Sequence, residues 1–265
     1  MSHAHLAAHI DRYAYINTLA KNSPATKIFF ALSALLISVL SPSPIVPVMV
    51  FVAAAILVLL FAKIPANFYL DLLIYPTVLA AISCIIIALF FGYGQPLTEI
   101  TLPWFNWTIY KNGINTAIAT FLRVEGATSA TFFLVLTTPM TDIVITFRKA
   151  HVPKILVEMS LLIYRYIFVF IEVTAKMQTA QKLRLGSSNL LRRIQSTALL
   201  MGNLFIRTLE QGERTFTAMS ARGYDGNIRV LEDAPKPRKA AVCAVIAFDA
   251  ALVFVAFLTI NFGIV

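Results

Sequence analysis

An arginine between two small residues is the feature of this sequence best suited to binding another molecule. Ala221-Arg222-Gly223 follows a long amphipathic stretch, and glycine there tolerates the left-handed backbone that ends a helix and turns the chain. The guanidinium group is thereby presented at a corner, where its donors can hold a carboxylate through two parallel hydrogen bonds. The alternative is an ordinary helix cap, in which the cation interacts with the helix dipole and stabilises the helix by roughly 0.3–1 kcal/mol.

A second arginine occupies a related position. Arg184 precedes Gly186 by two residues, and it also closes a long basic helical pattern. Two such sites in one segment favour docking onto a partner over two ordinary caps. Arg192 and Arg193 lie nearby and are an alternative to Arg184, although a solvated or headgroup-facing pair is an equal interpretation of them. The candidate site residues are Arg184, Gly186, Ala221, Arg222 and Gly223.

Two amphipathic helices must position these arginines. Apolar residues recur every three or four positions from Ile155 to Ala180, and again from Leu191 to Met219 after the capping cluster Ser187-Ser188-Asn189. Each helix has about 30 residues and is on the order of 45 Å long. Helices of this length and polarity are unsuited to a short membrane loop, so we expect them to cross one another beneath the bilayer.

The composition places the rest of the chain in a membrane. Of the 265 residues, 58% are hydrophobic and 13% charged, which is typical of an integral membrane protein rather than a soluble domain. The motif Ser41-Pro42-Ser43-Pro44 separates two apolar stretches that could pair as a hairpin. Five stretches approach the roughly 20 residues that a membrane span needs: Thr26–Leu40, Ile45–Ala62, Leu70–Gly92, Ile114–Thr138 and Ala240–Gly263.

The charges predict the topology. The segment from Pro139 to Lys239 holds sixteen of the 22 cations and eight of the 13 anions, a balance of +8 out of the chain's +9. The positive-inside rule therefore places this segment and the N-terminus in the cytoplasm, with the weakly charged stretch Gly92–Gly113 and the C-terminus outside. We expect an all-α integral membrane protein in the plasma membrane, with membrane helices in 1–141, cytoplasmic helices in 142–239 and a last membrane helix in 240–265.

Other reactive residues indicate no catalytic or metal site. Cys84 and Cys243 fall within apolar spans, where a thiol behaves as a small hydrophobe. His3 and His5 belong to a polar tail, and we expect no metal site and no cofactor. The basic segment lacks interleaved elements for reading or stacking bases, so lipid headgroups explain it better than nucleic acid.

Three ionisable residues lie inside predicted spans. Arg123, Glu125 and Asp249 are functional candidates by default, because charges are costly in a bilayer. Arg123 and Glu125 are two residues apart and face different sides of a helix. We therefore favour a structural pair with Asp249, or a contact for a membrane partner, over an ion path.

Further motifs give the chain a family resemblance. Ala218-Met219-Ser220-Ala221-Arg222-Gly223-Tyr224 is similar to the second signature Ala-Arg-Gly motif of the transmembrane T proteins of energy-coupling factor transporters, and Arg184-Leu185-Gly186 resembles a degenerate first motif. Pro24-Ala25-Thr26-Lys27 resembles the Pro-x-x-Lys entry to that family's first span. The nearest likeness is to CbiQ, the T protein of cobalt importers.

The resemblance implies a mechanical role. T proteins of this family couple a membrane substrate-binding S protein, here CbiM-like, to two cytoplasmic ABC ATPase subunits, and their motif arginines dock onto acidic grooves of the ATPases. The resemblance implies this docking role for Arg184 and Arg222 only. It also implies that the two long helices are the coupling helices. The first motif lacks the adjoining alanine and has Leu185 inserted, which puts the contact of Arg184 in doubt.

Independent features agree with a non-catalytic coupling subunit. The sequence has no Gly-x-x-x-x-Gly-Lys-Ser/Thr phosphate loop and no His-Glu-x-x-His motif, so ATP energy must come from a partner and an enzyme is not expected. The alternative is a self-sufficient permease or secondary transporter, for which inverted repeats or broken midplane helices would be typical. The resemblance implies cobalt as cargo, with nickel or a vitamin as alternatives.

Overall fold

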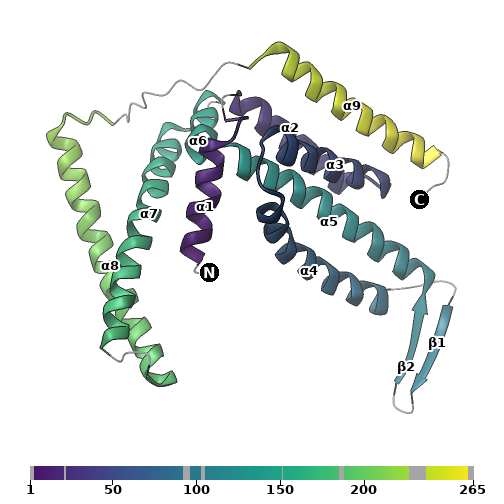
Figure 1. Ribbon diagram of the computed structural model, residues 1–265, viewed down its shortest axis with the longest axis horizontal. Helices are drawn as coiled ribbons and strands as arrows, with labels where there is room; N and C mark the ends of the chain where they lie inside the picture. Colours follow the sequence, from purple (N-terminus) through teal and green to yellow (C-terminus); the bar gives the residue numbers. More distant parts are fainter. Residues whose placement is uncertain are drawn as a thin grey trace. The chain divides into compact units, whose positions relative to one another are not determined.

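The computed structural model describes residues 3–20, 22–91, 96–102, 105–150, 152–184, 188–226 and 237–261. The chain forms two compact units. The first contains His3–Ile143 together with Ala234–Val265, and the second contains Val144–Asp233. Each unit is described by itself below, with element labels as in Figure 1.

The first unit is a bundle of apolar helices joined by short turns. Pro24 begins α2 at a position where its missing N–H costs nothing, and the break after Leu40 coincides with the predicted Ser-Pro-Ser-Pro motif. A π-helical turn, η1, extends α3. The helices are α1 (His3–Ile16), α2 (Pro24–Leu40), α3 (Ile45–Ile56), η1 (Leu57–Phe61), α4 (Ala66–Phe90), α5 (Lys111–Thr137) and α9 (Lys239–Asn261). Helix α6 (Met140–Lys149) begins at the end of this part of the chain and continues into the second unit.

Helices occupy the five stretches that were predicted to span the membrane. Within the described residues, three helical stretches are long and apolar enough to cross a membrane: Ala66–Phe90, Lys111–Thr137 and Lys239–Thr259. Two shorter apolar helices, Pro24–Leu40 and Ile45–Phe61, correspond to the predicted hairpin. Large apolar side chains such as Leu79 and Ile85 are exposed on the outer face of α4. This outward apolar surface is expected of a protein whose solvent is lipid.

The core of the bundle forms around α5. This helix packs against α2, α3 and α4, and the rings of Phe30 and Phe133 meet edge to face with centroids 5.1 Å apart. Tyr69 is buried in the same core and its hydroxyl shares a 2.9 Å hydrogen bond with the Ser129 hydroxyl. At Gly126 the backbones approach so closely that an added Cβ would lie 2.7 Å from the Pro47 carbonyl oxygen.

A two-stranded antiparallel hairpin connects α4 to α5. Strands β1 (Pro96–Leu102) and β2 (Phe105–Tyr110) pair with Leu102 opposite Phe105, and the register shifts between Pro96 and Thr98. We had expected only a weakly charged loop in this stretch. The alternation of apolar and polar residues from Phe105 to Ile109 is the signal for a strand that the all-α expectation left aside.

The second unit contains the two long amphipathic helices that the sequence predicted. They are α7 (Lys154–Leu183) and α8 (Leu190–Ala221), with Asn189 at the N-cap of α8. Gln181 donates a 2.8 Å hydrogen bond to the Ser196 carbonyl, and the Tyr166 hydroxyl hydrogen-bonds to Thr215. Because later residues of α7 meet earlier residues of α8, the two helices are antiparallel, as Figure 1 shows.

Candidate docking site

The end of α8 has the hydrogen bonding of a Schellman motif. Arg222 is the C-cap residue, Gly223 has a φ of +78°, and the Tyr224 N–H donates to the Met219 carbonyl at 3.0 Å. The Gly223 N–H donates to the Ser220 carbonyl at 3.0 Å. These two bonds satisfy carbonyls that a helix end would leave unpaired. The chain therefore turns immediately after the arginine, as the Arg-Gly pair predicted.

Arg222 is available to a partner. Ala221, Arg222 and Gly223 are all exposed. The Arg222 guanidinium makes no salt bridge or side-chain hydrogen bond with another described residue. A planar cation held at a rigid helix end with a small residue before it can accept a carboxylate without first breaking an internal contact.

Tyr224 fixes the turn that follows the arginine. Its hydroxyl donates a 3.0 Å hydrogen bond to Oε2 of Glu158, which is a buried residue near the start of α7. This hydrogen bond raises the pKa of the Tyr224 hydroxyl above its ordinary value. Sequence reasoning missed this contact, because 66 residues separate its partners.

Arg184 occupies the corresponding place on α7. It is exposed and is the C-cap residue of that helix, with its N–H donating to the Ala180 carbonyl at 3.3 Å. Like Arg222, it makes no ion pair with another described residue. Gly186, the last predicted member of the site, lies outside the described residues.

The two arginines lie at opposite ends of the antiparallel pair. Ala221, Arg222 and Gly223 are together at one end, near Glu158, whereas Arg184 is at the other end, near the start of α8. About 30 helical residues separate the ends, which corresponds to on the order of 45 Å. A single small ligand therefore cannot touch both arginines.

One face of α8 is apolar and uncovered. The predicted stripe is present, but most of its large side chains are exposed, with Phe205 at 65%. Soluble proteins rarely expose contiguous apolar surface of this kind unless it is a site of interaction. The exposed members include Leu191, Ile194, Met201, Phe205, Leu209 and Phe216.

The glycine at the end of α8 gives a prediction for stability. Replacing Gly223 by alanine should destabilise the helix end by roughly 1 kcal/mol, because a Cβ at positive φ is strained. Gly212→Ala is the matched control within α8, where an added Cβ meets nothing within 4 Å. This control should be neutral or stabilising by up to about 1 kcal/mol. Thermal unfolding in detergent, followed by circular dichroism, should show a lower melting temperature for Gly223→Ala and an unchanged or higher one for Gly212→Ala; equal shifts would contradict the assignment.

The intramembrane ionisable residues do not form the pair that we considered. Arg123 donates from Nε to the Ser41 carbonyl at 3.0 Å, and thus holds the turn between α2 and α3. Within the described residues it makes no salt bridge with Asp249. Buried oxygens of Glu125 and Asp249 have no hydrogen-bond partner among these residues. A structural role is thus visible for Arg123 alone.

Lys27 and Asn17 close the C-terminal end of α5. The Lys27 ammonium donates a 2.7 Å hydrogen bond to the Thr137 carbonyl, and Asn17 Nδ2 reaches the Leu136 carbonyl at 3.3 Å. Carbonyls in the last turn of a helix have no partner within the helix, and a cation there also complements its dipole. The Pro-x-x-Lys motif therefore ties the start of α2 to the end of α5.

Removing the Lys27 ammonium should measurably destabilise the bundle. Lys27→Met preserves most of the side-chain volume but removes a charged donor that is only 6% exposed. We expect a loss of about 1.5–3 kcal/mol in the free energy of unfolding. The exposed Lys239→Met is the control and should change stability by less than about 0.5 kcal/mol. Equal melting temperatures for the two variants in detergent would contradict this role.

No metal centre is visible in the parts of the chain that the structure describes. Within those ranges, no three His, Cys, Asp or Glu residues gather as a metal site would require. Cys84 and Cys243 are free thiols. The side chains of His3 and His5 lie outside the described residues.

The chain is similar to one family of known proteins along most of its length. The model of the family described as CbiQ, cobalt transport protein, matches residues 17–231. An uncharacterized protein of Methanocaldococcus jannaschii is 39% identical over 253 residues, which cover 96% of this chain and 94% of that protein.

Two further relatives have informative names. A putative fused cobalt transport protein CbiMQ of Methanocorpusculum labreanum is 33% identical over 84% of this chain and 38% of its own length. The energy-coupling factor transporter transmembrane protein EcfT of Staphylococcus aureus is 26% identical over 83% of this chain and 85% of its own length.

Proposed function

This chain belongs to the CbiQ family of cobalt transport proteins, and on that premise we propose that it is the coupling T subunit of an energy-coupling factor importer. Its membrane helices would hold a substrate-binding S protein, and α7 and α8 would pass the movements of cytoplasmic ATPases to the bundle. The observation that carries this proposal is Arg222, which is exposed at a rigid helix end and makes no ion pair with a described residue.

Two ABC ATPase subunits are the proposed partners of the arginines. The sequence has no phosphate loop of its own, so it needs an external source of energy. Arg222 and Arg184 lie at opposite ends of the helix pair, which suits one contact with each of two ATPases. Antiparallel helices that are linked at both ends can move as a single lever when a nucleotide-driven dimer closes.

A CbiM-like S protein is the proposed partner in the membrane. The name of the CbiMQ relative describes it as a fusion of a CbiM and a CbiQ protein in one chain. This fusion supports an association between the two proteins where they are separate chains. The exposed apolar face of α8 offers a surface for this contact. The lipid bilayer would cover the outward apolar faces of the spans.

The charge distribution supports a definite orientation. We propose that residues 142–239 and the N-terminus are cytoplasmic, and that the β1–β2 hairpin and the C-terminus are external. Because five is an odd number of spans, the two ends of the chain then lie on opposite sides of the membrane. The excess of eight positive charges between Pro139 and Lys239 lies on the cytoplasmic side.

Reconstitution distinguishes this proposal from a self-sufficient permease. The purified chain should be placed in liposomes alone, with ABC ATPases and a CbiM-like protein from its own organism, or with the same set in which the ATPases lack their catalytic glutamate. We expect uptake of radioactive cobalt only with the complete set and ATP. Uptake by the chain alone would establish the permease, whereas uptake of nickel or a vitamin in place of cobalt would correct the cargo but retain the coupling role.

A further inference from the structure

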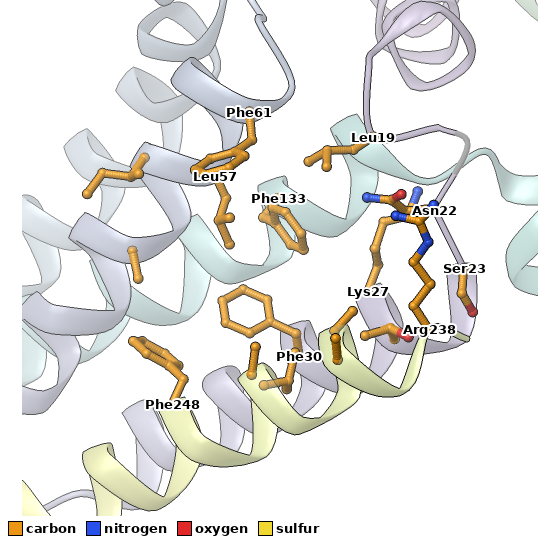
Figure 2. A pocket seen from close by; sticks show the side chains of 17 residues that line it. Leu19, Asn22, Ser23, Lys27, Phe30, Leu57, Phe61, Phe133, Arg238 and Phe248 are labelled. Carbon is orange, nitrogen blue, oxygen red and sulfur yellow. The ribbon is translucent and has the colours of Figure 1, made fainter. Parts of the chain in front are cut away.

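The first unit contains a pocket of about 940 Å³ that is polar at one end and apolar along the rest of its length. Figure 2 shows Asn22, Lys27 and Arg238 gathered at the polar end, with Phe30, Phe133 and Phe248 at a distance from it. The pocket lies among α2, α3, α5 and α9. Its volume is within the range of sites that bind small molecules.

The polar end has the chemistry of an anion site. Lys27 and Arg238 contribute cations there, and the N-termini of α2 and α9 are adjacent, so both helix dipoles favour negative charge. Asp142 interacts electrostatically with Lys27, whereas Arg238 makes no salt bridge with a described residue. No carboxylate occurs among the described residues that line the pocket, which is the opposite of what a divalent cation requires.

Two hydroxyl groups at this end have no hydrogen-bond partner among the described residues. Ser23 is only 7% exposed and precedes α2, yet its Oγ does not cap the helix and has no partner among the described residues. The buried Oγ1 of Thr26 is also unsatisfied. Both residues line the pocket. Because buried polar groups normally find partners, these hydroxyls indicate that a ligand with acceptor oxygens completes the site.

The apolar part is shaped for a hydrocarbon chain. Small residues of α9, Ala240, Ala241 and Ala244, face Phe30 and Leu57 across it. The first unit is a membrane bundle, so the molecule most abundant beside this opening is a lipid. We propose that the pocket binds one anionic phospholipid, with its phosphate between Arg238 and the start of α2 and one acyl chain between α9 and α3.

Native mass spectrometry of the delipidated full-length chain in detergent tests this binding. Phosphatidylglycerol should give a one-to-one adduct, whereas phosphatidylcholine at the same concentration should bind at least tenfold more weakly. Arg238→Ala should weaken phosphatidylglycerol binding roughly tenfold or more, because it removes a charged donor. Lys239→Ala, the adjacent cation outside the pocket, should have no effect.

A second pair of variants tests the apolar part. Ala244→Trp should fill the pocket and abolish the adduct, while Ala247→Trp, on the same helix but outside the pocket, should retain it. Inorganic phosphate at the same concentration should not displace the lipid. Equal binding of the two lipids, full binding by Arg238→Ala or Ala244→Trp, or displacement by phosphate would each overturn the proposal. Arg238 is exposed, so its variant remains informative even if Ala244→Trp fails to fold.

Discussion

Arg222→Glu is expected to detach the chain from its ATPases without unfolding it. An interfacial hydrogen-bonded charge pair loses about 2–5 kcal/mol when one partner is removed, and reversal of the charge adds repulsion. Association should therefore weaken at least thirtyfold, on the scale where about 1.4 kcal/mol is tenfold. Because Arg222 is exposed and has no salt bridge with a described residue, its loss should affect stability only through the helix dipole, by roughly 0.3–1 kcal/mol, and the melting temperature should fall only slightly.

The measurement is co-purification of ATPases with the tagged chain, combined with ATP-driven uptake in liposomes. Arg207→Glu is the matched control, because it reverses an exposed arginine of the same helix that we assign to no contact. Arg184→Glu should weaken one ATPase contact, and the double variant with Arg222→Glu should weaken association further. Undiminished association of Arg222→Glu would remove the proposed contact.

Gly126→Val is expected to prevent the membrane bundle from assembling. An added Cβ would lie 2.6 Å from the Ser38 hydroxyl oxygen and 2.7 Å from the Pro47 carbonyl oxygen. A serine side chain can rotate away, but the Pro47 backbone cannot move without displacing α3. Overpacking usually costs about 1–3 kcal/mol, and a clash with backbone should place this variant at or above the upper value.

Accumulation of monodisperse protein in detergent and its melting temperature measure this effect. Gly202→Val is the control, since an added Cβ at Gly202 meets nothing within 4 Å. Adding Ser38→Ala to Gly126→Val should fail to restore folding, because it leaves the Pro47 carbonyl in place. A Gly126→Val protein that melts like the wild type would show that α5 and α3 do not approach this closely.

Local sequence signals predicted the helices and the turn at the end of α8 well. The Ser-Pro-Ser-Pro break, the positions of the five spans, the long amphipathic pair and the turn at Gly223 all follow from interactions within a few residues. Hydrophobic periodicity and the conformational preference of glycine depend on residues close together in the chain, so both can be recognised from the sequence alone. The predicted roles of Arg184 and Arg222 came from family likeness and stay predictions.

Long-range contacts could not be predicted in the same way. Lys27 meets the Thr137 carbonyl across 110 residues, and Tyr224 meets Glu158 across 66. A lysine near a membrane surface and an exposed tyrosine have many equivalent destinations until packing selects one. The choice of Ser41, rather than Asp249, as the partner of Arg123 depended on the bend between α2 and α3.

Site-specific photo-crosslinking from position 221 tests the docking claim most directly. Ala221 is exposed and adjacent to Arg222, so a photoreactive amino acid there samples the surface that the guanidinium meets. In native membranes containing the whole set of transport proteins, the account predicts a crosslinked product with an ATPase subunit, lost when Arg222→Glu is added. Crosslinks confined to lipid or to the chain itself would contradict it.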